Sequence, residues 1–73
     1  MLRTAVRSSD LKSVGHDSAH NILEIEFQDG SIYRYANVSL ELYTGLMSAR
    51  SHGQYFSEKI KKFPNRYPYT KVR

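Results

Sequence analysis

The clearest pattern in the chain is an alternation of apolar and charged residues over residues 23–27. Apolar side chains at positions 23, 25 and 27 alternate with Glu24 and Glu26, which is the period of two of a strand with one buried and one solvated face. The turn signal Asp29-Gly30 follows. The β-branched and aromatic residues of 31–35 then predict the returning strand of a hairpin.

The loop length of this hairpin decides which side chains face the core. A two-residue loop would pair Ile25 with Arg34 and so place a guanidinium on the apolar face. A three-residue loop with Gly30 as a left-handed bulge instead pairs Ile25 with Tyr33. We predict this second register, in which both tyrosines of the strand face the core and Arg34 lies outward beside Glu24.

Two helices are predicted downstream of the hairpin. Ser39 can cap a helix over residues 40–50, whose apolar residues recur at helical spacing. Ser51, with Gln54 three positions further on, forms a capping box for a second helix over residues 52–62. A glycine close to the start of this second helix could instead close the first one.

The remaining patterns complete one small domain of 73 residues. Residues 11–16 are a weaker strand candidate, whose alternation would place Leu11 and Val14 on opposite sides, and a polar turn follows them. The simplest architecture is an α+β fold in which a three-stranded antiparallel meander carries two short helices on one face. Residues 1–8 and 70–73 are candidates for flexible ends, although the C-terminal segment could add a further strand.

The basic residues are concentrated at the C-terminal end. Residues 59–73 hold six of the eleven lysines and arginines and no acid, so they carry +6, while residues 1–58 sum to −2. Aromatic rings are interleaved with these cations, and such a mixture can place positive charge on phosphates and flat rings on bases. The candidate nucleic-acid-binding residues are Arg34, Lys59, Lys61, Lys62, Arg66, Tyr67, Tyr69, Lys71 and Arg73.

The other aromatic residues have a competing structural interpretation. Tyr33 and Tyr35 could form a stacking platform for unpaired bases, but the predicted register places them among core residues, which favours packing. Phe63 fits the apolar face of the second helix, so Tyr67 and Tyr69 are the rings that we expect to be free. The simplest alternative to binding is a solvated basic face that only keeps a small domain soluble.

Composition and spacing argue against several classes of function. The chain has no cysteine, which excludes disulfides and thiolate metal sites and favours a reducing compartment such as the cytoplasm. His16 and His20 lie four apart in a strand and turn, a spacing that does not place both on one face, so we expect no metal and no cofactor. The polar cluster 13–20 is more typical of a turn than of a catalytic triad, so we expect no enzyme. No apolar run is long enough to cross a membrane.

The order of these features resembles the KTSC domain, a short module named after the C-terminal domain of some lysyl-tRNA synthetases and also found as a free-standing bacterial or phage protein. Ser39 and His16 depart from the family pattern, which has a proline and an aromatic residue there. The resemblance implies the fold and, through the synthetase context, suggests RNA binding. The resembling positions are Ser8, Ser9, residues 23–27, Gly30, Tyr33, Arg34, Tyr35, Val38, Leu46, Ala49, Ser51, Gly53, Tyr55, Phe56, Ile60, Tyr67, Pro68 and Tyr69.

We therefore expect a small non-enzymatic module that binds tRNA or single-stranded RNA weakly through its basic aromatic C-terminal face. The alternative is a protein-interaction module. In that case Phe63, Tyr67 and Tyr69 would dock an acidic or apolar partner, or a second copy of the chain. The two hypotheses differ in whether the charges or the rings dominate binding.

Overall fold

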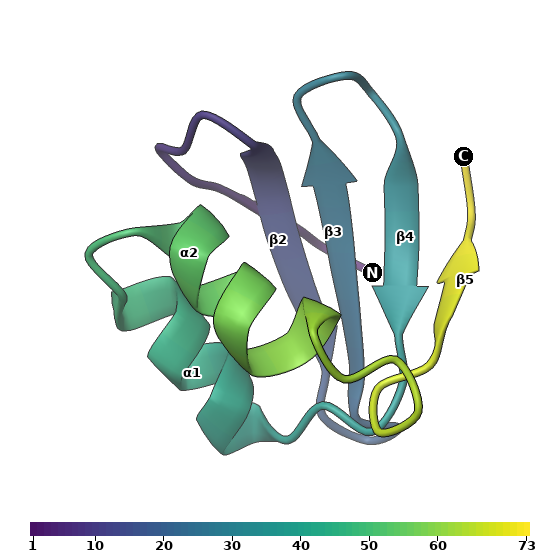
Figure 1. Cartoon of the computed structure of the whole chain (residues 1–73). Helices are drawn as coiled ribbons and strands as arrows, with labels where there is room; N and C mark the ends of the chain where they lie inside the picture. Colours follow the sequence, from purple (N-terminus) through teal and green to yellow (C-terminus); the bar gives the residue numbers. More distant parts are fainter.

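The computed structural model describes all 73 residues and has an α+β architecture (Figure 1). An antiparallel sheet of five strands runs in the order β1-β2-β3-β4-β5, and both helices lie on one of its faces. The helices are α1 (Leu40–Ser48) and α2 (His52–Phe56), and α2 continues into a π-helical segment, η1 (Ser57–Lys61). The strands are β1 (Thr4–Ala5), β2 (Leu11–Asp17), β3 (Ile22–Phe27), β4 (Ile32–Tyr35) and β5 (Tyr69–Lys71).

The prediction of a three-stranded sheet is wrong, although the α+β class is confirmed. β2, β3 and β4 form the expected meander, and β1 and β5 extend it at its two edges. The two added strands have only two and three residues, which is too few to show an alternation of apolar and polar positions. They form because each pairs backbone groups that an edge of the meander would otherwise leave without a partner. Both ends of the chain, named as candidates for flexibility, thus contribute to the sheet.

The predicted register of the hairpin between β3 and β4 is confirmed. Ile25 lies opposite Tyr33, and Glu24 lies opposite Arg34. Gly30 has a φ of 90°, and its N–H donates a hydrogen bond to the carbonyl of Phe27, as a three-residue loop with a left-handed bulge requires. The register therefore places tyrosine rings on the helix side of the sheet and the arginine on the other side.

A bulge in β2 explains why the alternation of its sequence is weak. Leu11 lies opposite Phe27, but Ser13 lies opposite Glu26, so one extra residue is accommodated between the two pairs. The bulge brings Leu11 to the same side of the sheet as Val14, and both are fully buried. The expectation that these two residues lie on opposite sides is therefore wrong.

Serine caps begin both helices, as the sequence predicts. The hydroxyl of Ser39 accepts a hydrogen bond from the N–H of Leu42, and that of Ser51 accepts one from the N–H of Gln54. The side chain of Gln54 donates to Glu58 at 3.3 Å instead of returning to the cap, so the capping box is only half formed.

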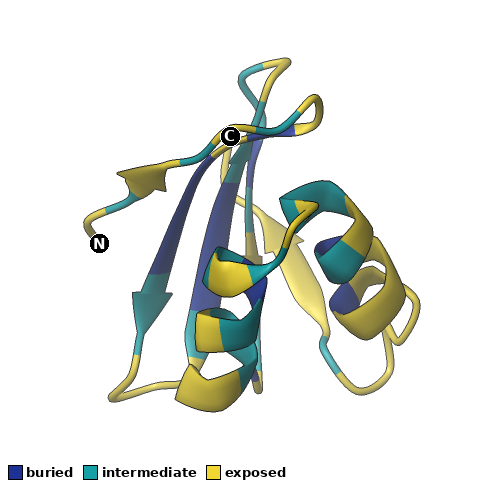
Figure 2. Cartoon of the chain, turned by 90° about the vertical axis from the view of Figure 1, so that its left-hand side faces the viewer, coloured by how far each residue is buried: buried dark blue, intermediate teal, exposed yellow.

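The core lies between the helices and the sheet. Figure 2 shows the buried residues on the strands and on the inner sides of the helices. Full burial of a large apolar side chain contributes about 1.5–3 kcal/mol, so these residues provide most of the stability. The core residues are Leu11, Val14, Leu23, Ile25, Tyr35, Val38, Leu46, Phe56 and Ile60.

The face of the sheet opposite the helices is crossed by the N-terminal residues, which pass behind β2 in Figure 1. Gly15 lies under this crossing, and a Cβ at this position would overlap the carbonyl oxygen of Leu2. Only glycine allows the N-terminal backbone to lie this close to β2.

Replacing Gly15 by alanine should therefore displace the N-terminal segment. We expect Gly15→Ala to lower the free energy of unfolding by about 1–3 kcal/mol, the usual cost of overpacking. Urea denaturation followed by circular dichroism measures the change, with Ser18→Ala at an exposed turn position as the control. Unchanged stability in Gly15→Ala would contradict this packing.

Candidate nucleic-acid interface

Aromatic rings form a connected cluster on the helix side of the sheet. The ring centroids of Tyr35 and Phe56 are 5.1 Å apart, and those of Tyr33 and Tyr69 are 5.7 Å apart. Tyr69 joins this cluster because it lies opposite Tyr35 in the pairing of β4 with β5, and directly opposite residues share a face. Phe27 contacts Tyr33 edge-on at 5.7 Å. The cluster leads from the buried Phe56 to Tyr69, which is 58% exposed.

A hollow of about 460 Å³ lies at the exposed end of this cluster and is termed the tyrosine hollow. The helices lie over β2 and β3 (Figure 1). Tyr35 on β4 is buried, whereas Tyr33 on β4 is partly exposed and Tyr69 on β5 is exposed. The volume falls within the range of sites that bind small molecules. The walls are Phe27, Ser31, Tyr33, Tyr35, Lys61, Pro64, Tyr67 and Tyr69.

Lys61 is the one basic residue that lines the tyrosine hollow. It is the last residue of η1, and its side chain is exposed. Lys59 and Lys62 are also exposed and lie close to it in sequence, but they do not line the hollow. Of the three predicted lysines of the second helix, the structure thus brings one directly to the rings.

Two further predicted cations lie beside the tyrosines. The guanidinium carbon of Arg66 is 5.8 Å from the centre of the Tyr67 ring, a cation–π arrangement. Lys71 lies opposite Tyr33 and therefore on the same face of the sheet. Both cations can contribute to the charge around the hollow.

Arg34 and Arg73 lie on the other face of the sheet, away from the tyrosine hollow. The Nε of Arg34 donates a hydrogen bond to Glu24 at 2.7 Å, and the guanidinium of Arg73 is 3.8 Å from the carboxylate of Glu26. The other carboxylate oxygen of Glu24 is paired with Arg3. These two predicted contact residues thus take part in ion pairs within the sheet.

Glu24 is buried, with 3% of the residue exposed, although the strand pattern indicates a solvated position. Burial alone would raise the pKa of Glu24. The hydrogen bonds and positive charges of Arg34 and Arg3 outweigh this effect, so the pKa lies below its ordinary value. The sequence did not identify the partner Arg3, because it lies 21 residues away on the N-terminal segment that crosses the sheet.

The histidines and the polar cluster around them have separate structural partners. His16 and His52 each form a hydrogen bond with a backbone carbonyl, at 2.7 and 2.8 Å, while His20 lies beside an aspartate. Ser13 donates to a glutamate and accepts from an arginine, and it forms no hydrogen bond with a histidine. No three metal-ligating side chains lie together, and no helix is long and apolar enough to span a membrane.

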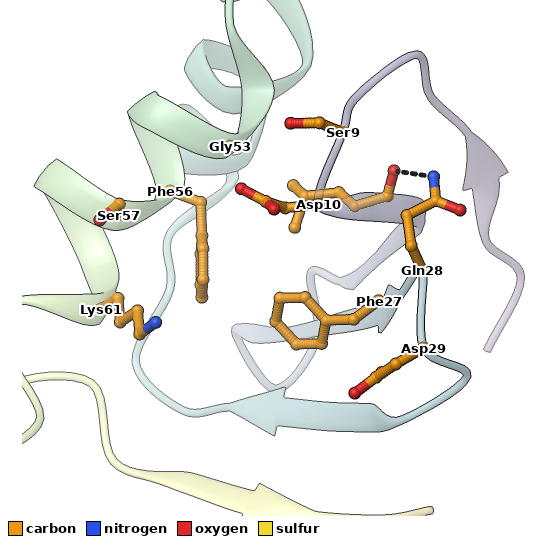
Figure 3. A pocket seen from close by; sticks show the side chains of 10 residues that line it. Ser9, Asp10, Phe27, Gln28, Asp29, Gly53, Phe56, Ser57 and Lys61 are labelled. Atoms are coloured by element: carbon orange, nitrogen blue, oxygen red, sulfur yellow. Dashed lines mark hydrogen bonds between the residues drawn. The ribbon is translucent and has the colours of Figure 1, made fainter.

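Figure 3 shows the side chains that line a second hollow, of about 450 Å³. Asp10 and Asp29 lie at its rim, so it is termed the acidic hollow. Phe27 and Lys61 line both hollows, which therefore form one groove between the helices and the sheet. The full lining of the acidic hollow is Ser9, Asp10, Leu11, Phe27, Gln28, Asp29, Gly53, Phe56, Ser57 and Lys61.

Sequence reasoning missed the acidic hollow because its walls come from segments far apart in the chain. The available signal was the resemblance itself, since Ser9, Gly53 and Phe56 are among the positions that carry it. A serine, a glycine and a phenylalanine do not form a recognisable binding motif in the sequence. They indicate a site only because the fold places them around the same hollow.

Comparison with protein families agrees with this arrangement, because the model of the KTSC domain matches residues 7–67. The chain belongs to the KTSC domain family. The crystal structure of a KTSC domain protein from Yersinia pestis has a TM-score of 0.90 and 32% sequence identity, and covers 99% of this chain and 97% of that one. An uncharacterized protein from Stutzerimonas stutzeri is 40% identical over 72 residues, 99% of each chain. A protein from Tsukamurella paurometabola is 34% identical over 56 residues, 77% of this chain and 84% of the other.

The KTSC match includes the whole acidic hollow and most of the tyrosine hollow. It ends at Tyr67, so Tyr69 on β5 completes the second hollow from outside the matched residues. The groove is thus largely formed by residues within the family match, and Tyr69 lies just beyond it.

The ion pairs of Glu24 predict how stability depends on pH. Folding lowers the pKa of Glu24. The ion pairs therefore contribute fully to the free energy of unfolding above the unfolded-state pKa of about 4.5, and this contribution is lost as the pH falls through the folded-state pKa. We expect Glu24→Gln to lower the free energy of unfolding by about 2 kcal/mol at pH 7, since it leaves two arginines without their partner.

Urea denaturation at neutral and at acidic pH measures this effect. At about pH 3, below the unfolded-state pKa, the loss should shrink, because the carboxylate of the unfolded chain is then protonated and the ion pairs favour folding less. The exposed Glu58, replaced by glutamine, is the control and should change stability little at either pH. An equal loss in Glu24→Gln at both pH values would contradict the assignment.

Proposed function

We propose that this KTSC domain binds single-stranded RNA weakly, with one unpaired base against the tyrosines and the backbone along the basic residues. The observation that carries the proposal is the tyrosine hollow, where exposed ring surface and Lys61 lie together. Stacking on aromatic rings and neutralisation of phosphates are the two interactions by which proteins hold single strands without strong sequence preference.

Fewer basic residues are proposed to contact RNA than the sequence suggests. Lys61, Arg66 and Lys71 lie around the tyrosines and are retained. Arg34 and Arg73 are left out, because they are paired with glutamates on the other face. The two other lysines near η1 remain as exposed charge close to the groove.

The distribution of charge along the chain favours an anionic partner. Residues 59–73 carry +6, whereas residues 1–58 sum to −2. Such segregation attracts a polyanion to one end of the molecule and orients it there. If about three phosphates are neutralised, the affinity for a single strand should fall with salt at a log–log slope of about −2.

Fluorescence-anisotropy titration of labelled single-stranded RNA tests the proposal. We expect binding at about 50 mM salt and an affinity about tenfold lower at about 200 mM salt. Lys61→Ala should weaken binding at low salt and reduce the salt slope, whereas Arg50→Ala, at an exposed position outside the groove, should leave both unchanged. No binding at low salt would refute the proposal.

The same titration separates stacking from simple charge attraction. Tyr69→Ala should reduce affinity about tenfold with little change in salt slope, because a stacked base contributes about 1–3 kcal/mol without releasing counterions. Val72→Ala is the matched control, since Val72 is also exposed and lines a different hollow, with Arg34 and Thr70. Equal effects of the two substitutions would argue against stacking.

A second candidate is the docking of a protein at the same end of the molecule. The expectation that Phe63 is buried and Tyr67 is free is wrong, because Phe63 is 47% exposed and Tyr67 packs against the core. Tyr69 is 58% exposed, and β5 is an edge strand, a feature that can accept an extended peptide. Recovery of partners from a lysate before and after nuclease treatment distinguishes the candidates. An RNA-bridged association should disappear on digestion, whereas direct protein docking should survive it.

A further inference from the structure

The groove consists of two neighbouring hollows of similar volume. Its two hollows, of about 450 and 460 Å³, share Phe27 and Lys61 as common walls. A lysine between two hollows is positioned to contact the phosphate that links two consecutive nucleotides, and its ammonium has three donors to share. The groove therefore has one exposed ammonium group flanked by two hollows.

The acidic hollow has an aromatic floor. The rings of Phe27 and Phe56 are 5.8 Å apart and tilted by 59°, and both side chains point into the hollow in Figure 3. The Lys61 side chain reaches in from the helix side. Phe56 is 3% exposed and supports Phe27 from the core, so the partly exposed Phe27 is the ring on which a flat base can stack.

The rim of this hollow carries two carboxylates that have unused acceptor capacity. One oxygen of Asp29 accepts hydrogen bonds from the N–H and the hydroxyl of Ser31, at 3.0 and 2.6 Å, and the other oxygen has no protein donor. The hydrogen bonds from Ser31, with a smaller contribution from the charge of Lys71, lower the pKa of Asp29, so it is ionised at neutral pH. The carboxylate of Asp10 accepts no hydrogen bond, and neither acid is paired with Lys61.

Two carboxylates repel a phosphate, so the group that enters this hollow must present N–H donors. Guanine presents two adjacent donors, N1–H and the 2-amino group, beside the acceptor O6. A carboxylate accepts from both donors, and an ammonium donates to O6. Uracil has one donor between two carbonyls, while adenine and cytosine place an unprotonated ring nitrogen beside their amino group, which a carboxylate disfavours.

We propose that the acidic hollow binds a guanine base, next to the base held in the tyrosine hollow. This inference rests on the proposed RNA binding and gives it a base preference. The free oxygen of Asp29 accepts from the guanine donors, Lys61 contacts O6 and the linking phosphate, and the partly exposed Phe27 supports the ring. Asp10 adds a second acceptor at the rim.

The test compares three labelled RNAs of equal length by fluorescence anisotropy: oligouridine, oligouridine with one guanosine, and the same RNA with inosine in place of guanosine. We expect the guanosine RNA to bind about tenfold more tightly than oligouridine, the gain expected from hydrogen bonds to a charged acceptor. Inosine lacks only the 2-amino group, so it should lose most of that gain.

The variant Asp29→Asn tests whether the preference for guanosine RNA arises from the acidic hollow. Asparagine keeps the oxygen that accepts from Ser31, so the loop should remain folded, which circular dichroism checks. We expect the guanosine preference to fall below about twofold, while binding of oligouridine stays equal or becomes tighter, because a negative charge near the RNA is removed. Glu41→Gln, at an exposed position on α1 outside the groove, should keep the preference.

The outcomes separate this inference from the proposed function. Binding of oligouridine without a guanosine preference, or a preference that survives in Asp29→Asn, overturns the guanine pocket and leaves RNA binding standing. No binding of any of the three RNAs at low salt overturns the proposed function and the pocket together. A preference that is lost in Asp29→Asn and kept in Glu41→Gln supports the pocket.

Discussion

The register of the hairpin between β3 and β4 is the constraint on which both faces of the sheet depend. A slip by one residue would move every side chain of β4 to the opposite face. Tyr33 and Tyr35 would then leave the groove, and Arg34 would enter the core. Gly30, with a φ of 90°, holds the loop length that prevents this slip. A single loop residue therefore determines where the rings and the charges lie.

The two faces of the sheet differ in how many of their charged and aromatic side chains are free to contact a partner. On the face without helices, Glu24 pairs with Arg3 and Arg34, so its charges stabilise the fold and hold the N-terminal segment. On the helix face, the helices lie over β2 and β3, while Tyr35 on β4 is buried and Tyr69 on β5 is exposed. The cluster of aromatic rings thus extends from the core to the surface. The available ring surface and the unpaired Lys61 lie on the same side.

The sequence predicted those structural features that are determined by residues close to them in the chain. The hairpin register followed from Gly30 and the alternation around it, and the helix starts followed from Ser39 and Ser51. The bulge in β2 could not be predicted, because it depends on which residues of β3 lie opposite Leu11. The pairing of Arg3 with a glutamate 21 residues away, and the acidic hollow, depend on tertiary contacts that no local pattern records.

The proposed binding would be coupled to stability, because the floor of the groove is also the wall of the core. Phe56 is 3% exposed and belongs to the core cluster, yet it lines the acidic hollow. A ligand that binds only the folded chain stabilises it by mass action, which matters for a domain of this size. Substitution of Phe56 would damage both properties at once. Specificity can therefore change more freely at Asp29 and Lys61, where a rim side chain can be replaced without opening a cavity.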